Sequence, residues 1–366
     1  MKELTRVKHE VLKDNSVIDS ESTSDANKTE SDTEPEKEEE ELLIVDGIRR
    51  HGRFKTRPYD VDPLDESSLI PRGLRRFRLK EWVGFTLLHP ELSSSMILQE
   101  AHYLASSEIY VRDKHGMVEH SRNVRGGSLK LPHELFPSAP AIDANGYWIA
   151  YDWAEQPNGR HRIRVSVDAT AEQAAIKMDL ELDGSKASAP LSVSSPLPGG
   201  AMYTHKVAYP ASGSITVGDR TYSFDSSRDI AILDEHRTFL PYRTNWLWGT
   251  FAAITPDGVI GANFAQRPIV PRTEEESCLW TPGACEPLAD ITFKQASNDP
   301  LAPWHITSAD GRLDVTFTPE DRKDVMHQLV VASIDYWQLV GTYTGTVAGH
   351  EVSGVRGVCE SMRARL

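Results

Sequence analysis

The sequence lacks any long apolar run. The longest early run, residues 42–45, follows an acidic stretch and is too short to form the core of a signal peptide. A membrane-spanning helix needs about 18 or more apolar residues, and no window of this sequence approaches that length. We therefore expect a cytoplasmic protein with no stable membrane insertion.

Cysteine is scarce as well. The chain has three, Cys278, Cys285 and Cys359, and a small odd number does not suit a disulfide framework. The spacing of the first two matches no common zinc motif. The 13 His residues are scattered, and the His-Glu pair at 133–134 is not followed by the second His of a zinc-protease motif. The sequence predicts no metal site.

The signatures of several large enzyme classes are missing. There is no GxxxxGK[ST] loop, no GxGxxG between a strand and a helix, and no GxSxG elbow. These absences argue against P-loop ATPases, Rossmann oxidoreductases and serine hydrolases. We expect no cofactor.

Negative charge is concentrated at the N-terminus. Residues 1–46 hold 15 Asp and Glu against six Lys and Arg, so nine of the 14 net negative charges fall there. Because residues 1–41 contain no aromatic residue and little else that could form a core, we predict a disordered acidic tail over residues 1–45. It would serve as a solubilising tail or as a regulatory segment.

A basic stretch follows this tail, with ten Arg and Lys between residues 49 and 80. Clustered Arg can bind phosphates. Here, however, the basic residues interleave with Phe54, Tyr59, Leu74, Phe77 and Leu79, a pattern typical of strand or arm residues with one wet face. We expect no nucleic-acid partner.

The rest of the chain has the pattern of β-structure. Short apolar or alternating segments recur, at 82–88, 163–167, 174–180, 215–217, 259–264 and 313–317. Turn residues separate them, as at 183–184, 218–219, 256–258 and 310–311. Helical periodicity is limited to one short candidate at 226–233. We predict an all-β, mostly antiparallel protein whose strands form two sheets or closed barrels.

The most linker-like stretch of the body is residues 194–200, Ser-Ser-Pro-Leu-Pro-Gly-Gly. It suggests a division into an N-terminal half, 46–200, and a C-terminal half, 201–366. The two halves would still be able to pack as one unit.

Candidate functional residues are densest between 203 and 263. His205 and Lys206 end one expected strand, Asp234 and His236 follow the helical candidate, and Trp246, Trp248 and Asn263 come next. Strand alternation places both Trp side chains on one face. Trp beside Asp and His can line a cavity for an apolar or sugar-like ligand. The alternative is a packed barrel interior that the Trp side chains simply fill.

Two carboxylates further along could also face such a cavity. Glu276 ends a run of three Glu beside an apolar segment, and Glu360 lies near the C-terminus. A carboxyl buried among aromatic residues has a raised pKa, which suits proton transfer. The alternatives are a solvated loop for Glu276 and a salt bridge from Glu360 to Arg363 or Arg365.

A series of segments in this order resembles one known family. They are Leu79-Lys80-Glu81-Trp82, Thr204-His205-Lys206, Leu233-Asp234, Thr244-Asn245-Trp246-Leu247-Trp248-Gly249, Gly261-Ala262-Asn263-Phe264, Glu276-Ser277-Cys278-Leu279-Trp280, Pro303-Trp304-His305-Ile306, Asp314-Val315-Thr316-Phe317-Thr318-Pro319, Gly341-Thr342-Tyr343-Thr344-Gly345 and Gly357-Val358-Cys359-Glu360. The resemblance is to domain-of-unknown-function family 2804, over about residues 46–366. The family usually has Asn where Ser277 stands, and it tends to end in Arg-Trp rather than Arg365-Leu366.

The family is similar, more distantly, to paired lipocalin-like barrels such as carotenoid hydratases, tocopherol cyclases and fungal pericyclases. The resemblance implies two packed antiparallel lipocalin-like, or calycin-like, barrels or sandwiches. A pocket would lie at their interface or in one mouth. It does not fix a reaction, because one fold serves many chemistries.

Our leading hypothesis is a cofactor-independent lyase or isomerase that hydrates, dehydrates or cyclises a largely apolar small metabolite. A neutral Asp234 or Glu276 would donate a proton, and His236 or His205 would accept one. Trp246 and Trp248 would face the developing cation, and Asn263, Lys206, Trp304 and Glu360 would contact substrate. The alternatives are a non-enzymatic carrier of a lipid or isoprenoid and a carbohydrate-active enzyme with two carboxylates. The oligomeric state stays open.

Overall fold

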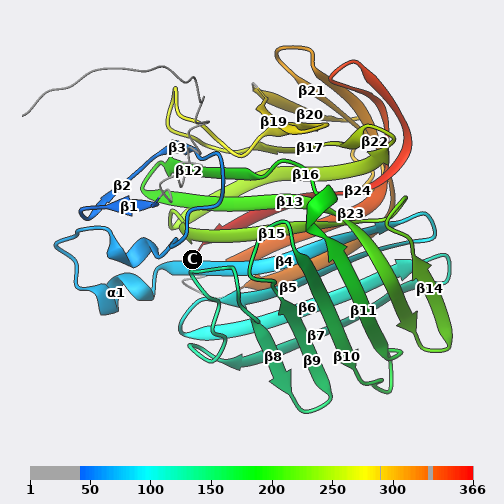
Figure 1. Cartoon of the computed structure of the whole chain (residues 1–366), viewed down its shortest axis with the longest axis horizontal. Coiled ribbons are helices and arrows are strands. Elements are labelled where there is room, and N and C mark those ends of the chain that lie inside the picture. The colour runs from blue at the N-terminus through cyan, green and yellow to red at the C-terminus, as the bar shows by residue number, and fades with distance from the viewer. Residues whose placement is uncertain (1–41, 289, 329–332, 366) are drawn as a thin grey trace, which may run out of the picture. The chain divides into compact units, whose positions relative to one another are not determined.

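The computed structural model describes residues 42–288, 290–328 and 333–365. Most of the predicted acidic tail, residues 1–41, lies outside this range. Within it, three short strands and two single-turn helices form an N-terminal arm (Figure 1). They are β1 (Ile44–Val45), β2 (Ile48–Arg49), β3 (Gly52–Arg53), the 3₁₀ turn η1 (Pro63–Asp65) and α1 (Arg72–Arg76).

The first large sheet is a nearly closed antiparallel barrel. Its main strands are β4 (Leu79–His89), β5 (Leu92–Glu100), β6 (Leu104–Asp113), β7 (Gly116–Arg125), β8 (Ala141–Ala144), β9 (Tyr147–Asp152), β10 (Arg160–Val167), β11 (Ile176–Asp183), β12 (Leu191–Leu197), β13 (Gly200–Val217), β14 (Arg220–Phe224) and β15 (Ile230–Phe239); the 3₁₀ turn η2 (Gly184–Lys186) follows β11. The spatial order is β7-β6-β5-β4-β15-β13-β11-β10-β9-β8, with β12 and β14 also paired to β13 and β3 paired to β12. The two ends approach where Ser107 on β6 contacts the Tyr147 hydroxyl on β9 at 2.9 Å.

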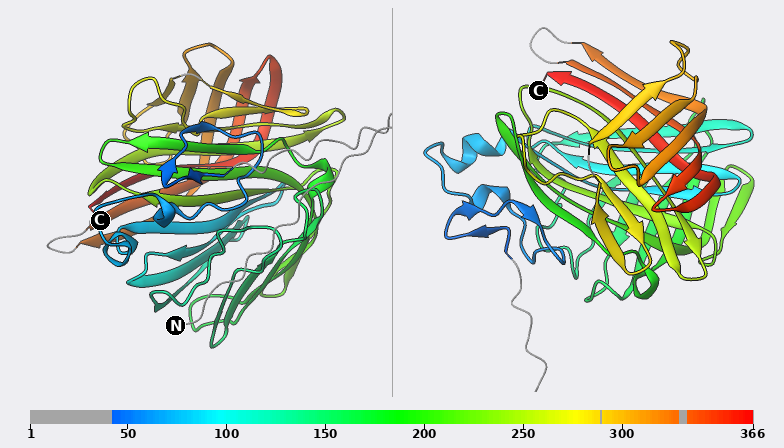
Figure 2. Two further views of the ribbon diagram at one scale, coloured as in Figure 1. Left: turned by 60° about the vertical axis from the view of Figure 1, so that its left-hand side comes forward. Right: turned by 90° about the horizontal axis from the view of Figure 1, so that it is seen from above.

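The second large sheet is a half-barrel. It consists of β16 (Arg243–Thr255), β17 (Gly258–Gln266), β18 (Cys278–Thr281), β19 (Ala284–Pro287), β20 (Ile291–Gln295), β21 (Trp304–Ser308), β22 (Leu313–Gln328), β23 (Ser333–Val347) and β24 (His350–Arg365). The order is β19-β18-β17-β16-β24-β23-β22-β21-β20. In Figure 1, β17 and β19 to β22 lie above the strands of the first sheet, while β16, β23 and β24 overlap its strands β13, β15 and β4; Figure 2 gives two further views.

Alternating side chains give each sheet two faces. Along β11, Ile176, Met178 and Leu180 are buried while the residues between them are exposed, as the sequence pattern predicts for a half-buried strand. These residues join the core inside the first barrel. A separate core of aliphatic and aromatic residues, Phe251, Phe317 and Tyr343 among them, belongs to the second sheet.

The two sheets pack against each other through their outer faces. A cluster of apolar residues joins Ile230 and Ile232 of β15 to Trp280 of β18, and a second one joins Tyr110 of β6 to Trp248 of β16. The all-β prediction with two packed barrel-like sheets is therefore confirmed.

The predicted helix at 226–233 is wrong. Residues 225–229 form a turn in which the Asp225 carboxylate accepts from the Ser227 amide, and β15 begins at Ile230. The first four residues of β15 are all buried, because the barrel core covers one face and the second sheet covers the other. A strand buried on both faces has no alternating pattern.

The predicted division at residue 200 does not coincide with a change of sheet. Residues 198 and 199 form the tight turn between β12 and β13, which pair with each other. The chain leaves the first sheet after Phe239 and enters the second at Arg243. The extents of the two halves as domains stay a prediction.

Candidate functional site between the sheets

Polar side chains gather on the outer face of the first barrel, where it meets the second sheet. Register pairs Thr204 with His236 and Lys206 with Asp234 across β13 and β15, and Trp82 of β4 with His236. Paired residues in antiparallel strands point to the same side. The five side chains therefore form one surface, which faces β16 and β24.

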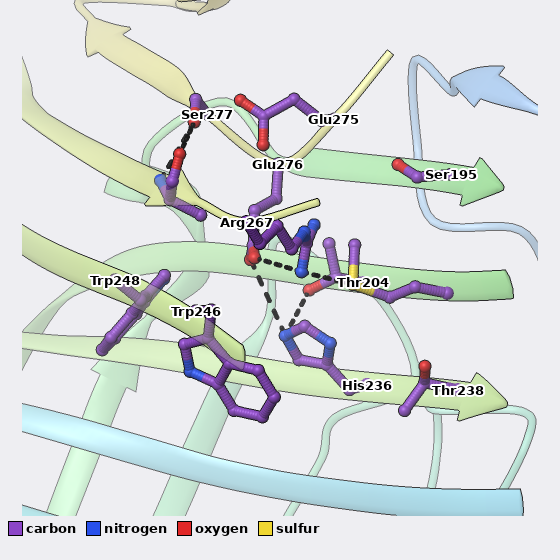
Figure 3. A network of polar contacts seen from close by, with 12 residues as sticks. Ser195, Thr204, His236, Thr238, Trp246, Trp248, Arg267, Glu275, Glu276 and Ser277 are labelled. Carbon is purple, nitrogen blue, oxygen red and sulfur yellow. Dashed lines mark hydrogen bonds and ion pairs between the residues drawn. The ribbon is translucent and has the colours of Figure 1, made fainter. Parts of the chain in front are cut away.

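A chain of ion pairs runs through this surface. The Lys206 ammonium contacts the Asp234 carboxylate, lies 3.3 Å from Glu276, and lies 4.7 Å from the centre of the Trp248 ring. Arg267 contacts the other oxygen of Glu276 at 2.9 Å. Figure 3 shows Arg267 and Glu276 reaching from the segment between β17 and β18 toward His236 and Thr204.

His236 is held on three sides. Its Nε2 lies 3.0 Å from Asp234 and 3.0 Å from the Thr204 hydroxyl, and its ring stacks on Trp82 with 4.3 Å between centroids. Burial lowers the pKa of His236, and Asp234 only partly offsets this effect. The imidazole is thus neutral near pH 7 and can accept a proton.

The carboxylates of this network are charged. Burial alone would raise the pKa of Asp234, but Lys206 and His236 lower it well below its ordinary value. Burial likewise opposes ionisation of Glu276, yet Arg267 and Lys206 lower its pKa. The expectation that burial holds one of the two neutral is wrong, because each has a cationic partner that the sequence alone did not identify.

The pKa of Glu360 is shifted in the opposite direction, upward. It accepts hydrogen bonds of 2.9 Å each from Trp246 Nε1, the Tyr336 hydroxyl and Gln338 Nε2, and none of these donors is charged. Burial raises the pKa of Glu360, the three hydrogen bonds offset this in part, and the nearby Asp234 charge raises it further. Glu360 therefore favours the protonated form more than an ordinary glutamate does.

Solvent reaches this surface in part. The Asp234 side chain is 26% exposed, whereas the side chains of Lys206 and Glu276 are 1% and 4% exposed. Several neighbours are also partly exposed, namely Trp82, Trp246, Tyr336 and Glu360. A pocket of about 70 Å³ nearby has Trp246 and Arg267 in its lining. We call the surface from Trp82 to Glu360 the inter-sheet site.

The sequence profile described as "Domain of unknown function (DUF2804)" matches residues 36–366. The chain belongs to this family. No curated protein matches the sequence. Among solved structures, this DUF2804 chain is similar to kievitone hydratase from Nectria haematococca, at 11% sequence identity and a TM-score of 0.44, over 78% of this chain and 88% of that one. A likeness of this degree carries no information about activity.

The family position 277 lies away from the open part of the site. Ser277, where the family resemblance leads us to expect Asn, is fully buried and accepts a hydrogen bond from the Ala265 amide at 3.0 Å. It fixes the segment that carries Glu276. The other difference, Leu366, lies outside the described residues.

Several predicted residues meet in the inter-sheet site. The structure brings together Lys206, Asp234, His236, Trp246, Trp248, Glu276 and Glu360. Asn263 has a supporting position, since its amide accepts from Trp248 Nε1 and donates to the Glu276 carbonyl, both at 2.9 Å. Trp246 and Trp248 share one face of β16, as the alternation predicts.

Two predicted residues lie elsewhere. His205 is on the opposite face of β13 from Lys206, inside the first barrel, where burial lowers its pKa to about 3 and Glu235 only partly offsets this. Trp304 belongs to the core of the second sheet, with its ring centre 5.8 Å from that of Trp337. Neither contacts the inter-sheet site.

Sequence reasoning missed Trp82, Thr204, Arg267, Tyr336 and Gln338 as members of the site. Tyr336 and Gln338 share a face of β23, but the sequence analysis did not predict this strand. Arg267 follows the end of β17, and no feature of the sequence pointed to it.

In the part of the chain that the structure describes, no group of three His, Cys, Asp or Glu could hold a metal ion. No helix of that part is long and apolar enough to cross a membrane.

The ion pairs predict how stability depends on pH. A carboxylate with a lowered pKa stabilises the fold above its unfolded pKa, about 3.9 for Asp, and this contribution is lost as pH falls through the folded value. We expect Asp234→Asn to lower the free energy of unfolding by about 2 kcal/mol at pH 7, and by progressively less below pH 4. Urea unfolding at pH 7, 5 and 3 measures the difference. Asp335→Asn, an exposed control on β23, should show no such trend, and a pH-independent loss in Asp234→Asn would contradict the ion-pair account.

Proposed function

We propose that this protein is a lyase or isomerase that moves protons on a largely apolar small metabolite, by hydration, dehydration or cyclisation. One observation carries the proposal. The inter-sheet site holds a carboxyl group with a raised pKa, Glu360, and a carboxylate–imidazole pair, Asp234 and His236, whose carboxylate has a lowered pKa. Two titratable groups whose pKa values are shifted in opposite directions are the usual arrangement of an acid and a base in one active site.

Glu360 is the proton donor in this proposal. Its three neutral hydrogen-bond donors fix the carboxyl group without forcing it to ionise. A general acid works best when its pKa is close to the working pH, because it must be protonated and still acidic. The raised pKa of Glu360 moves it in that direction.

His236 is the proton acceptor at Nδ1, the ring nitrogen without a hydrogen-bond partner among the described residues, while Nε2 faces Asp234 and Thr204; Asp234 stabilises the imidazolium that results. The 3.0 Å contact between them orients the ring, and stacking on Trp82 favours the positive charge. In hydration, Glu360 gives a proton to one carbon of a double bond while His236 takes a proton from the attacking water. In isomerisation, His236 removes one proton and Glu360 delivers another. In both reactions the enzyme ends a turnover with Glu360 ionised and His236 protonated, and it is reset when His236 releases its proton to solvent and Glu360 takes one up.

The aromatic side chains around the inter-sheet site indicate the kind of substrate. Partly exposed Trp82 and Trp246 offer flat apolar surfaces. Aromatic faces also stabilise a developing carbocation, by about 1–2 kcal/mol. An unsaturated or ring-forming hydrocarbon skeleton with few polar groups fits these walls better than a sugar does.

Isotope labelling tests this proposal without knowledge of the substrate. The full-length protein is incubated with a metabolite extract of its own host in D₂O, and in parallel in H₂¹⁸O. We expect at least one apolar metabolite to gain deuterium at carbon, to gain ¹⁸O together with a new hydroxyl group, or to lose the mass of one water, only when the protein is present. High-resolution mass spectrometry detects all three changes.

The control variant is Glu351→Gln, an exposed site on the same strand as Glu360. It should label the same metabolite at the wild-type rate. Failure of the wild-type protein to cause any of these three changes would overturn the proposal. Recovery of an unchanged apolar ligand bound at one-to-one stoichiometry would instead indicate a carrier protein.

A further inference from the structure

A second cavity lies at one end of the first barrel, apart from the inter-sheet site. Its volume is about 490 Å³, within the range of about 300–1,000 Å³ that small-molecule sites occupy. Along β4, Leu79 and Glu81 share a face with Val83 and Phe85, which belong to the core inside the barrel. The cavity is therefore the mouth of the barrel, and α1 and the segment around residues 127–133 form its sides.

The deep part of this mouth is largely apolar. Leu79, Leu129 and Leu131 line it and are 8% exposed or less. Two hydrogen bonds hold the segment that carries Leu129 and Leu131. Arg237 donates to the Pro132 carbonyl at 2.7 Å, and Arg57 donates to the His133 carbonyl at 2.6 Å. The apolar lining thus belongs to a fixed wall.

Two carboxylates line the cavity, and each has cationic or imidazole partners: Asp62 is paired with Arg72 at the rim, and Glu81 lies among the leucines. Glu81 lies 2.8 Å from His102 Nε2, 3.2 Å from His133 Nε2 and 3.5 Å from Arg237 Nε. Burial alone would raise the pKa of Glu81, but Arg237 and the two His lower it. A ligand entering the mouth therefore meets polar imidazole edges at the floor and no bare negative charge.

The backbone of His102 is held in an uncommon conformation to keep its side chain there. Its φ is +68°, in the left-handed region that favours glycine. Glu100 stabilises this turn by accepting hydrogen bonds from the His102 amide at 2.6 Å and the Gly127 amide at 2.9 Å. Backbone strain of this kind is found more often at ligand sites than elsewhere.

The rim of the mouth is cationic. Arg72, Arg76 and Lys130 line it and are exposed. Arg72 is paired with Asp62 and Asp65, and Arg76 donates to His102. Lys130 makes no hydrogen bond or ion pair that the described residues show.

We propose that the mouth of the first barrel is a second ligand site, which binds a small amphipathic carboxylate with its apolar part against Leu79, Leu129 and Leu131 and its carboxylate at Lys130. A chain or ring system of about ten carbons is short enough for the cavity. The site does not depend on the chemistry of Glu360.

Decanoate is the probe, and decanol is its uncharged match. We expect decanoate to bind the full-length protein at one-to-one stoichiometry in calorimetry, about ten times more tightly than decanol. Lys130→Glu should weaken decanoate binding at least about tenfold. Lys114→Glu, the same charge change at an exposed position in the β6–β7 turn, should leave it unchanged.

A second variant fills the mouth without disturbing the fold. Gly73 lines the cavity, and a Cβ added there meets no atom within 4 Å. Gly73→Trp should therefore abolish decanoate binding with no loss of thermal stability, since Gly is also a poor helix residue.

Three results would overturn the proposal. They are absence of decanoate binding at millimolar concentration, equal binding of decanol, and equal binding by Lys130→Glu and Lys114→Glu. Glu360→Gln separates the two sites, because it should bind decanoate like the wild-type protein whatever it does to turnover.

Discussion

Glu360→Gln is expected to lower turnover of the isotopically labelled metabolite by about 10²- to 10⁴-fold, the usual contribution of a general acid. Glutamine has nearly the shape of protonated glutamate. Its one amide oxygen can accept from both Tyr336 and Gln338, as Glu360 Oε2 does, but its amide group cannot act as a proton donor in catalysis. Binding of the metabolite should change little. Turnover is measured by deuterium incorporation, and binding by calorimetry with the identified compound.

The pH profile distinguishes acid catalysis from a structural effect. If Glu360 must be protonated, the wild-type rate falls as pH rises through its raised pKa. The residual rate of Glu360→Gln should lack this fall. Glu351→Gln keeps the wild-type profile in this account. A Glu360→Gln variant with full turnover, or one whose rate still falls at the same pH, would rule out Glu360 as the donor.

The all-β architecture could be predicted from sequence because alternation is local. Residues 176–183 alternate strictly, and the structure places them in a half-buried strand. The pairing of β4 with β15 joins residues about 150 positions apart, and no local pattern encodes it. The helix predicted at 226–233 failed for a related reason, since only the packing of both sheets on β15 explains its unbroken apolar run.

The site could be predicted in part for similar reasons. Residues two apart on a strand share a face, so Asp234 and His236, or Trp246 and Trp248, belong together wherever the strand goes. The same rule places neighbours such as His205 and Lys206 on opposite faces of a strand. The sequence-based prediction did not apply it there and assigned both residues to one site. The ionisation states could not be predicted, because they depend on Lys206 and Arg267. The pairing of β13 with β15 brings Lys206 to Asp234, the packing of the two sheets brings it to Glu276, and the path of the segment between β17 and β18 brings Arg267 to Glu276.

The second large expected effect concerns a buried pair of oppositely charged side chains, Arg57 and Glu235, next to the barrel mouth. Arg57 of the N-terminal arm contacts both oxygens of Glu235 at 2.7 Å each, and both side chains are buried. Arg57→Met should lower the free energy of unfolding by about 3–5 kcal/mol, because it leaves a buried carboxylate without its main partner. Urea unfolding at pH 7 measures the loss.

To test whether burial causes the loss of stability in Arg57→Met, we compare this variant with one at an exposed pair of the same geometry. Arg162 makes the same two-pronged contact with Asp179, at 2.6 Å to each oxygen, but on the solvent side of β10 and β11. Arg162→Met should change stability little, since solvent screens an exposed pair. Similar losses in both variants would mean that geometry, not burial, sets the effect.

The pH dependence of the Arg57→Met loss has a definite sign. Burial opposes ionisation of Glu235, but Arg57 lowers its pKa from 4.5 to about 2. The pair therefore stabilises the fold above about pH 4.5, and this contribution disappears as pH falls toward 2. The difference in the free energy of unfolding between wild type and Arg57→Met should shrink over that interval.

In addition, Arg57→Met/Glu235→Gln should lose less stability at pH 7 than the two single variants lose in sum, because the double variant leaves no unpaired carboxylate. A loss that stays constant from pH 7 to pH 2 would assign the role of Arg57 to its bond with the His133 carbonyl at the barrel mouth instead.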